Sequence, residues 1–308
     1  MRFAFTKCHG SGNDFPLIDA RAIALADAEW SSVARALADR GGPVGGDGLL
    51  LLTRARGASA FGMRMFNPDG SESETCLNGL RCVARAGLDA LGIDTASVAL
   101  KTSVAQVALV APLAPGVVTV RTIAGPASID PAAVGIHVDA PVIEAPIEGL
   151  PSARRFTAVA MPNPHLISFG TLDDGALIAL GMWCEARPPL LVDRANVSYV
   201  EQRGPDLFVR TFERGVGLTN ACGSAMAAAT YAAALTDRIA WDTAITVFNP
   251  GGRVRAAASR SGWVTIEGNA TFEWAGEIEL DLAAGKAIAP VMTDRRDEEV
   301  AAWARVIA

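Results

Sequence analysis

Short stretches in which apolar and polar residues alternate recur along most of the chain, and this pattern predicts β-strands. Two Ala-rich apolar segments, at residues 80–91 and 225–235, are typical of helices instead. The predicted strands are residues 98–100, 107–110, 117–121, 156–160, 197–200, 207–212, 245–248, 254–257, 263–267 and 272–280. Because many short strands accompany only a few helices, we predict an α+β (mixed α/β) fold.

An internal repeat runs through this pattern. Cys76 and Cys222 each come ten positions after the last residue of a strand, follow a polar loop that contains glycine, and precede one of the Ala-rich helices. An Asn-centred turn beside an apolar strand lies upstream of each copy, at Asn13 and at Asn163. The repeat predicts two structurally similar halves.

A Pro-rich stretch after the first copy suggests a boundary near Gly125. The tail has acids in its early turns and brings Val300, Trp303 and Ile307 onto one face, which predicts an amphipathic helix that begins at Thr293 or Asp294. The expected parts are residues 1–125 with Cys76, joined by a strand near 276–290; residues 126–275 with Cys222; and a terminal helix at 291–308.

Composition and charge exclude several classes of protein. The chain has 308 residues, 50% of them hydrophobic and 19% charged, which suits two globular domains and not a disordered chain. The net charge is −6 and the arginines are scattered singly, so we expect no nucleic-acid partner. The start of the chain lacks a secretory leader pattern, and we expect a cytoplasmic protein with no membrane partner.

Five cysteines are an odd number spread over a long chain, which indicates free thiols and not a disulfide scaffold. No CxxC or paired-His spacing occurs among them and the three histidines, so we predict no metal site. Cys8, Cys82 and Cys184 are expected to be buried packing residues.

Cys76 and Cys222 differ from the other cysteines because each stands at the start of a predicted helix. Unpaired N–H groups and the helix dipole favour a thiolate at such a position. The neighbouring N–H groups can also hold the carboxylate of a small ligand; they belong to Leu77, Asn78, Gly79, Gly223 and Ser224. One thiolate and one thiol on either side of an α-carbon can remove and return its proton, which inverts the configuration.

The sequence resembles the diaminopimelate epimerase family along most of its length, from about Met1 to Pro290, and its motifs occur in family order. The matching blocks are His9-Gly-Ser-Gly-Asn13-Asp-Phe15, Phe66-Asn67-Pro-Asp-Gly-Ser71, Cys76-Leu-Asn78-Gly79-Leu-Arg81-Cys82, Asn163-Pro-His165, Arg194-Ala-Asn196, Glu213-Arg214-Gly215, Ala221-Cys222-Gly223-Ser224 and Pro250-Gly251-Gly252.

This resemblance implies two pseudo-symmetric domains, each a mixed, mostly antiparallel sheet wrapped around a central helix, with the active site between them. It implies epimerisation of LL- to meso-diaminopimelate for lysine and peptidoglycan precursor synthesis, without pyridoxal phosphate or another cofactor, by the acid/base pair Cys76 and Cys222. His165 and Glu213 would support the thiols or the substrate. The implied substrate-binding residues are Asn13, Asn67, Leu77, Asn78, Gly79, Asn163, Asn196, Glu213, Arg214, Gly223 and Ser224.

The sequence departs from the family pattern at four positions that bear on substrate range. Leu77 and Ala225 stand where the family usually has glycine, and Leu218 replaces an acidic residue. Gly48 stands where some members carry a glutamine that contacts the substrate.

Two other functions fit the same residues. The departures allow a related two-cysteine racemase that acts on a different amino acid, and the paired cysteines allow a thiol redox or amino acid binding protein. By resemblance we also expect a homodimer, with an edge strand around Phe272-Glu-Trp274 as a contact.

Overall fold

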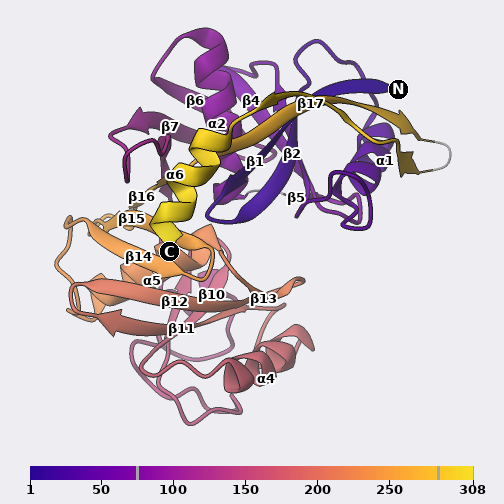
Figure 1. Cartoon of the computed structure of the whole chain (residues 1–308). Coiled ribbons are helices and arrows are strands. Elements are labelled where there is room, and N and C mark those ends of the chain that lie inside the picture. The colour runs from indigo at the N-terminus through magenta and orange to yellow at the C-terminus, as the bar shows by residue number, and fades with distance from the viewer. Residues whose placement is uncertain (74–75, 283–284, 308) are drawn as a thin grey trace. The chain divides into compact units, whose positions relative to one another are not determined.

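The computed structural model of the chain describes residues 1–73, 76–282 and 285–307 (Figure 1). The chain divides into two compact units, unit 1 (Met1–Thr122 and Glu267–Ala308) and unit 2 (Ile123–Ile266). It passes from one unit to the other within β8 (Thr119–Ala124) and returns within β16 (Val264–Asn269). Residues 267–275, which the predicted boundaries place in the C-terminal half, therefore belong to unit 1.

Unit 1 contains a mixed sheet with the strand order β19-β17-β1-β2-β3-β4-β6-β7-β8, in which β2–β3 and β4–β6 are parallel pairs. Its elements are β1 (Arg2–Gly10), β2 (Asn13–Asp19), α1 (Asp27–Ala38), β3 (Leu49–Thr53), β4 (Phe61–Phe66), β5 (Glu72–Ser73), α2 (Leu77–Leu91), β6 (Thr95–Ala99), β7 (Val104–Val110), β17 (Thr271–Asp281), β18 (Lys286–Ala287), β19 (Val291–Arg295) and α6 (Asp297–Ile307).

Unit 2 contains a second mixed sheet with the strand order β9-β10-β11-β12-β14-β15, in which β10–β11 and β12–β14 are the parallel pairs. Its elements are α3 (Pro131–Val134), β9 (Thr157–Ala160), β10 (Pro164–Phe169), α4 (Asp174–Glu185), β11 (Asn196–Arg203), β12 (Asp206–Glu213), β13 (Gly217–Thr219), α5 (Gly223–Leu235), β14 (Ile245–Asn249) and β15 (Gly252–Ala258).

The two sheets have the same topology, which confirms the two similar halves expected from the repeat. From β1 to β7 the successive pairings are antiparallel, parallel, antiparallel, parallel and antiparallel, and the series from β9 to β15 is identical. In unit 1 the short strand β5 pairs with β4, and in unit 2 the short strand β13 pairs with β12. The central helix follows the short strand in each unit. Each of the ten predicted strands overlaps a strand of the structure.

A central helix lies against the sheet in each unit, α2 in unit 1 and α5 in unit 2. Leu80, Val83 and Leu88 of α2 are fully buried in a core that is shared with β1, β3, β4, β6 and β7. The start of α2 lies so close to β1 that a Cβ added at Gly10 would be 2.7 Å from the carbonyl oxygen of Asn78. Glycine is therefore required at this contact, which places the N-terminus of α2 beside the turn between β1 and β2.

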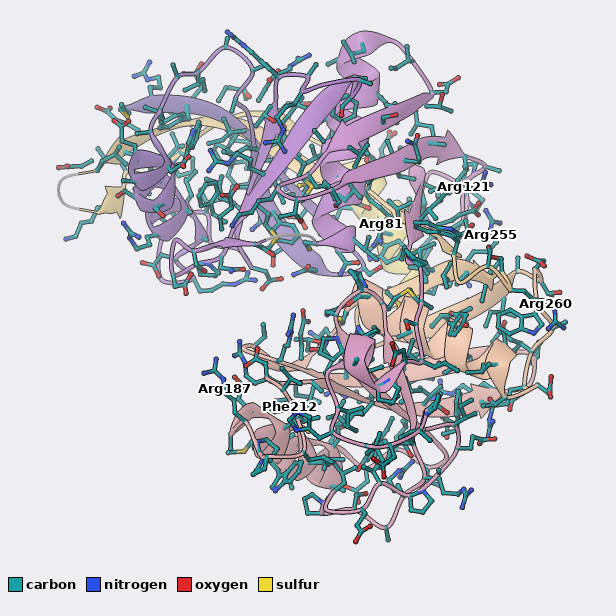
Figure 2. All side chains as sticks on the ribbon, turned by 180° about the vertical axis from the view of Figure 1, so that it is seen from behind. Arg81, Arg121, Arg187, Phe212, Arg255 and Arg260 are labelled. Atoms are coloured by element: carbon teal, nitrogen blue, oxygen red, sulfur yellow. The ribbon has the colours of Figure 1, made fainter. Side chains whose placement is uncertain are left out.

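In unit 2 the outer helix α4 covers a separate core with Leu177, Leu180 and Cys184. Phe212 of β12 lies against this helix (Figure 2), where a Cβ added at Gly181 would be 2.1 Å from its ring. The absence of a side chain at Gly181 therefore allows α4 to approach the strand that leads toward Cys222.

The C-terminal tail differs from the single helix that we expected over residues 291–308. Residues 291–295 form β19, which pairs with β17, and α6 begins only at Asp297; Ala308 lies outside the described residues. The helix buries Trp303, whose ring centroid lies 5.9 Å from that of His9 in β1. The tail therefore packs on unit 1.

The prediction of an edge strand around Phe272 and Trp274 is wrong. In the structure β17 lies between β1 and β19, and Trp274 pairs with Lys7 on one side and Arg295 on the other. Trp274 also stacks edge-to-face on Phe5, with 4.9 Å between the ring centroids. These aromatic side chains pack within unit 1 because β19 occupies the free edge that was expected at β17.

None of the helices in the described ranges is long and apolar enough to span a membrane.

Candidate active-site residues in the two units

In unit 1, Cys76 is the N-cap residue of α2. Its backbone is extended, and its Sγ accepts a hydrogen bond of 3.4 Å from the Gly79 N–H. The same Sγ lies 3.7 Å from Oδ1 of Asn13, to which it donates. Leu77, Asn78 and Gly79 form the first turn of the helix, so the structure brings five predicted site residues together at this helix start.

The side chain of Asn13 lies between this helix start and a cluster of charged residues. Its Nδ2 donates to Oδ2 of Asp47, and its Oδ1 accepts from Nδ2 of Asn78 at 3.5 Å. Asp47 also accepts from Arg40 at 2.6 Å, and Arg40 binds Asp14 at the same distance. The loop that carries Asp47 thus fixes the amide of Asn13.

Arg81, one turn further along α2, is completely buried in unit 1 (Figure 2). Its Nη2 donates to Oδ1 of Asn78 at 2.9 Å and to Oγ of Ser11 at 3.1 Å, and its Nε donates to the carbonyl of Asn269. Burial lowers the pKa of its guanidinium to about 10, so it remains charged at neutral pH. This buried cation connects the start of α2 with the β1–β2 turn and β16.

Asn67 lies in the turn after β4. Its Nδ2 donates to the Ser71 hydroxyl at 2.9 Å, and its backbone N–H donates to the Ser71 carbonyl at 2.8 Å. The side chain therefore stabilises its own turn, as an asparagine beside proline commonly does.

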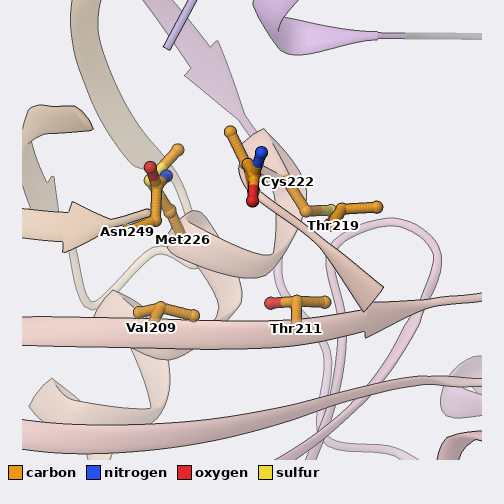
Figure 3. A pocket seen from close by; sticks show the side chains of 8 residues that line it. Val209, Thr211, Thr219, Cys222, Met226 and Asn249 are labelled. Carbon is orange, nitrogen blue, oxygen red and sulfur yellow. The ribbon is translucent and has the colours of Figure 1, made fainter. Parts of the chain in front are cut away.

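In unit 2, Cys222 holds the equivalent position as the N-cap residue of α5, with Gly223 and Ser224 in the first turn. Its sulfur lies 3.5 Å from the Ser224 hydroxyl. Cys222 is 6% exposed as a whole residue and borders a small pocket at the start of the helix (Figure 3). Side chains from β12, β13, α5 and β14 line this pocket, among them Thr211, Thr219, Met226 and Asn249.

His165 of β10 connects two of the predicted asparagines. Its Nε2 lies 3.0 Å from Oδ1 of Asn163 and 3.5 Å from Nδ2 of Asn196, while Oδ1 of Asn196 accepts from the Arg214 N–H at 2.9 Å. Burial, with the nearby charge of Arg214, lowers the pKa of His165 to about 3. The imidazole is therefore neutral near pH 7 and contacts Asn163 and Asn196 in that form.

Glu213 and Arg214 follow each other at the end of β12, where Glu213 pairs with Gly217 of β13. The Arg214 guanidinium is 3.9 Å from the Asp193 carboxylate. Glu185 of α4 accepts a hydrogen bond of 2.9 Å from the Gly215 N–H, which connects the turn after Arg214 to the outer helix.

The other three cysteines are fully buried in hydrophobic cores, as expected for packing residues. Cys8 and Cys82 lie in the core of unit 1 and Cys184 in that of unit 2. Burial raises the pKa of the Cys8 thiol well above its usual value and that of Cys184 to about 12. Cys8 and Cys184 are therefore poor nucleophiles and poor acid/base groups near neutral pH.

At the positions that depart from the family pattern, the side chains are accommodated by packing. Leu77 packs against the core of unit 1 and Leu218 against that of unit 2, and Ala225 is fully buried. Gly48 has no room for a side chain, because an added Cβ would be 2.4 Å from the Phe66 carbonyl oxygen.

Sequence reasoning assigned no role to Asp47, Arg81 or Asn269. Arg81 lies inside one of the matching blocks and Asp47 directly precedes Gly48, and a charged residue among small and amide residues is the signal that could have identified them. Asn269 lies 258 positions from Ser11, and its Oδ1 accepts a hydrogen bond from the Ser11 N–H, a contact that no local pattern predicts.

The part of the chain that the structure describes contains no group of three or more metal-ligating side chains suited to a metal ion.

Comparison with solved structures places the fold in a known group. A phenazine biosynthesis protein of the PhzF family from Bacillus anthracis superposes with a TM-score of 0.64 at 14% identity, covering 91% of this chain and 100% of that one. A hydroxyproline epimerase from Agrobacterium vitis gives a TM-score of 0.63 at 13% identity, covering 99% of this chain and 98% of that one. At such low identity these matches establish the fold alone, the diaminopimelate epimerase-like fold of two similar halves.

Sequence comparison then identifies the family. The family model described as diaminopimelate epimerase matches residues 5–111. A diaminopimelate epimerase from Listeria innocua is 36% identical over 293 aligned positions, covering 90% of this chain and 88% of the relative. A diaminopimelate epimerase from Lactiplantibacillus plantarum is 36% identical over 325 aligned positions, covering 98% of this chain and 97% of the relative. The chain belongs to the diaminopimelate epimerase family, a family of isomerases.

Proposed function

We propose that this protein interconverts LL- and meso-diaminopimelate, with Cys76 and Cys222 as the two acid/base groups. The observation that carries the proposal is that each cysteine is the N-cap residue of the central helix in its unit, at equivalent points of two identical strand topologies. Each cysteine thus stands at the start of a helix, and the Cys76 sulfur accepts from one of its first N–H groups. Two such positions suit a reaction that needs two equivalent groups of opposite protonation state.

In the proposed reaction, the thiolate of one cysteine removes the α-proton from one face of the substrate. The thiol of the other cysteine delivers a proton to the opposite face, and the configuration inverts. Negative charge that develops on the substrate carboxylate is stabilised by N–H groups of the two helix starts, at Leu77, Asn78 and Gly79 and at Gly223 and Ser224. No electrons are transferred, and the two sulfurs exchange protonation states.

The remaining polar residues would recognise the second amino acid centre of diaminopimelate. Arg214 can bind a carboxylate bidentately, and asparagine amides can accept from an ammonium group and donate to a carboxylate. Glu213 would support the thiols or pair with the substrate ammonium. The asparagines that would recognise this second centre are Asn67, Asn163 and Asn196, and His165 orients the last two through the contacts described above. Asn13 would also hold the substrate.

The cellular context follows from the same proposal. Meso-diaminopimelate would serve lysine and peptidoglycan precursor synthesis, and by family resemblance the protein would act as a cytoplasmic homodimer without a bound cofactor. Five free cysteines suit a reducing compartment.

The proposal is tested by incubating the purified, reduced protein with LL-diaminopimelate in deuterated water. We expect meso-diaminopimelate with one deuterium at the inverted α-carbon, measured by mass spectrometry and chiral chromatography. Absence of label uptake would overturn the proposal. A panel of amino acids with a single α-centre tests the racemase alternative, because rapid label uptake by one of them, without turnover of diaminopimelate, would assign a different substrate.

A further inference from the structure

Two ionised residues of unit 1 fix the orientation of the two asparagine amides beside Cys76. Asp47 is an acceptor only, so the Asn13 group that faces it must be the NH2 group. Arg81 is a donor only, so the Asn78 group that faces it, at 2.9 Å, must be the carbonyl oxygen. Each amide orientation is therefore set by a charged partner that admits only one arrangement.

The consequence is that the carbonyl oxygen of Asn13 points toward Cys76. With its Nδ2 held by Asp47, Oδ1 of Asn13 lies 3.5 Å from Nδ2 of Asn78 and 3.7 Å from the Cys76 sulfur. An amide oxygen can only accept, so the hydrogen bond to the sulfur requires an S–H group. The Gly79 N–H donates to the other side of the same sulfur at 3.4 Å.

We propose that Asp47 and Arg81 are positioning residues that aim the Asn13 carbonyl at Cys76, and that this contact outweighs the charge of Arg81 and the start of α2 and holds the cysteine as the protonated thiol, the proton donor of the free enzyme. This inference rests on the proposed function, in which the two cysteines differ in protonation state. In the first turnover, the proton of the Cys76 S–H bond goes to the α-carbon while the Cys222 thiolate takes the proton removed from the opposite face. Cys76 is left as the thiolate, with the Gly79 N–H as its donor.

Charged groups from several elements surround this arrangement. Lys7 of β1 and Arg40 of the loop before β3 pair with Asp14 of β2, and Arg40 also pairs with Asp47. The positive charge of Arg81 on α2 also interacts with Cys76 and favours its thiolate, so this charge acts against the Asn13 contact. Glu72 of β5 pairs with Arg64 of β4. A change at Asp47 thus alters both the local charge and the Asn13 orientation, and an experiment must separate the two effects.

The experiment measures alkylation of Cys76 by iodoacetamide as a function of pH, in the full chain without substrate. Trypsin leaves each of the five cysteines on a different peptide, and Cys76 lies on residues 65–81, so mass spectrometry follows it separately. In Asp47→Ala the Asn13 amide can rotate and present its NH2 group to the sulfur, which favours the thiolate. We expect the midpoint of Cys76 alkylation to fall by about 0.5–1 pH unit relative to the unmodified protein.

Asp47→Asn is the matched control for charge. It removes the same charge as the alanine variant but keeps a carbonyl oxygen that can accept from Asn13, while Arg40 retains its contact with Asp14. We expect its midpoint to stay within about 0.2 pH unit of the unmodified protein. Equal shifts in the alanine and asparagine variants would mean that charge alone acts and would overturn the proposal, as would no shift in the alanine variant.

Asn13→Ala provides a second route that does not depend on the folding of the Asp47 variants. Removing the acceptor should lower the Cys76 midpoint, and adding Asp47→Ala to this variant should lower it no further, because the two residues act through one contact. An additive shift in the double variant contradicts the inference. Because these measurements need no substrate, their failure leaves the proposed epimerisation untouched, whereas absence of deuterium uptake tests that function separately.

Discussion

Glu299 of α6 binds Arg85 of α2 through both carboxylate oxygens, with Nη1–Oε2 and Nη2–Oε1 distances of 2.5 and 2.9 Å. Arg85 is 7% exposed, its Nη1 also donates to the carbonyl of Ala270, and its guanidinium lies over the Phe272 ring. This ion pair thus connects the C-terminal helix α6 to α2, the helix that begins after Cys76. The contact spans 214 positions in the sequence.

Replacing this carboxylate should lower the stability of the protein. Glu299→Ala leaves a buried guanidinium without its main partner, and we expect the free energy of unfolding to fall by about 2–4 kcal/mol. Urea denaturation measures the change. Asp297→Ala is the matched control, because its pair with Arg295 is exposed and should contribute less than about 0.5 kcal/mol. A loss in the control as large as that in Glu299→Ala would contradict this assignment.

Two buried histidines should make stability depend on pH. A free histidine has a pKa of 6.5. Burial, assisted by the charge of Arg81, lowers the pKa of His9 to about 4, and burial lowers the pKa of His165 to about 3. Between pH 6.5 and about 4 the unfolded chain takes up protons that the folded chain does not, so this stability is present above pH 6.5 and is lost as the pH falls toward 4.

Urea denaturation at several pH values between 7 and 4.5 tests this dependence. From the two lowered pKa values we expect a loss of about 4–5 kcal/mol across the window, and about half that loss in His9→Gln because one of the two groups is removed. His137→Gln, at an exposed histidine, should keep the full dependence. An unchanged slope in His9→Gln would contradict the lowered pKa of His9.

The duplication and ten of the strands could be predicted from the sequence, because alternation within a strand and the spacing of strand, loop and helix are local properties. The helix α4 was not predicted, since residues such as Leu177, Ile178, Leu180 and Met182 cover it on several sides without a clear polar face. Likewise β19 lies inside a stretch whose acidic and cap-like residues suited a longer helix, and only its pairing with β17 makes it a strand.

The positions of Cys76 and Cys222 at helix starts agree with their sequence setting, but the groups around them could not be predicted. Asp47 reaches Asn13 across 34 positions, and Arg81 binds the Asn269 carbonyl across 188. Such contacts depend on which strands become neighbours, and sheet topology is set by tertiary packing and not by local pattern. The packing of Leu77 against the core of unit 1 also depends on tertiary contacts and could not be predicted from the local sequence.

Gly48 should not tolerate the glutamine that some family members carry at this position. An added Cβ would be 2.4 Å from the Phe66 carbonyl oxygen and 3.1 Å from Cε of Met65, so β3 and β4 would have to separate locally. We expect Gly48→Gln to lower the free energy of unfolding by about 2–3 kcal/mol in urea denaturation. Gly175→Ala is the control, since an added Cβ there makes only ordinary contact and alanine favours the α4 helix. A Gly48→Gln variant as stable as the control would show that the strands adapt without cost.

The central claim is that two cysteines, one in each unit, act on the same carbon. It is tested most directly by deuterium incorporation into LL-diaminopimelate by Cys76→Ser and Cys222→Ser in the presence of reductant, with Cys184→Ala as the control for a buried cysteine. We expect each serine variant to lose conversion to the meso isomer by a factor of at least about 10², while the control keeps most of its activity. Conversion by either serine variant at the rate of the unmodified protein would contradict the two-cysteine mechanism.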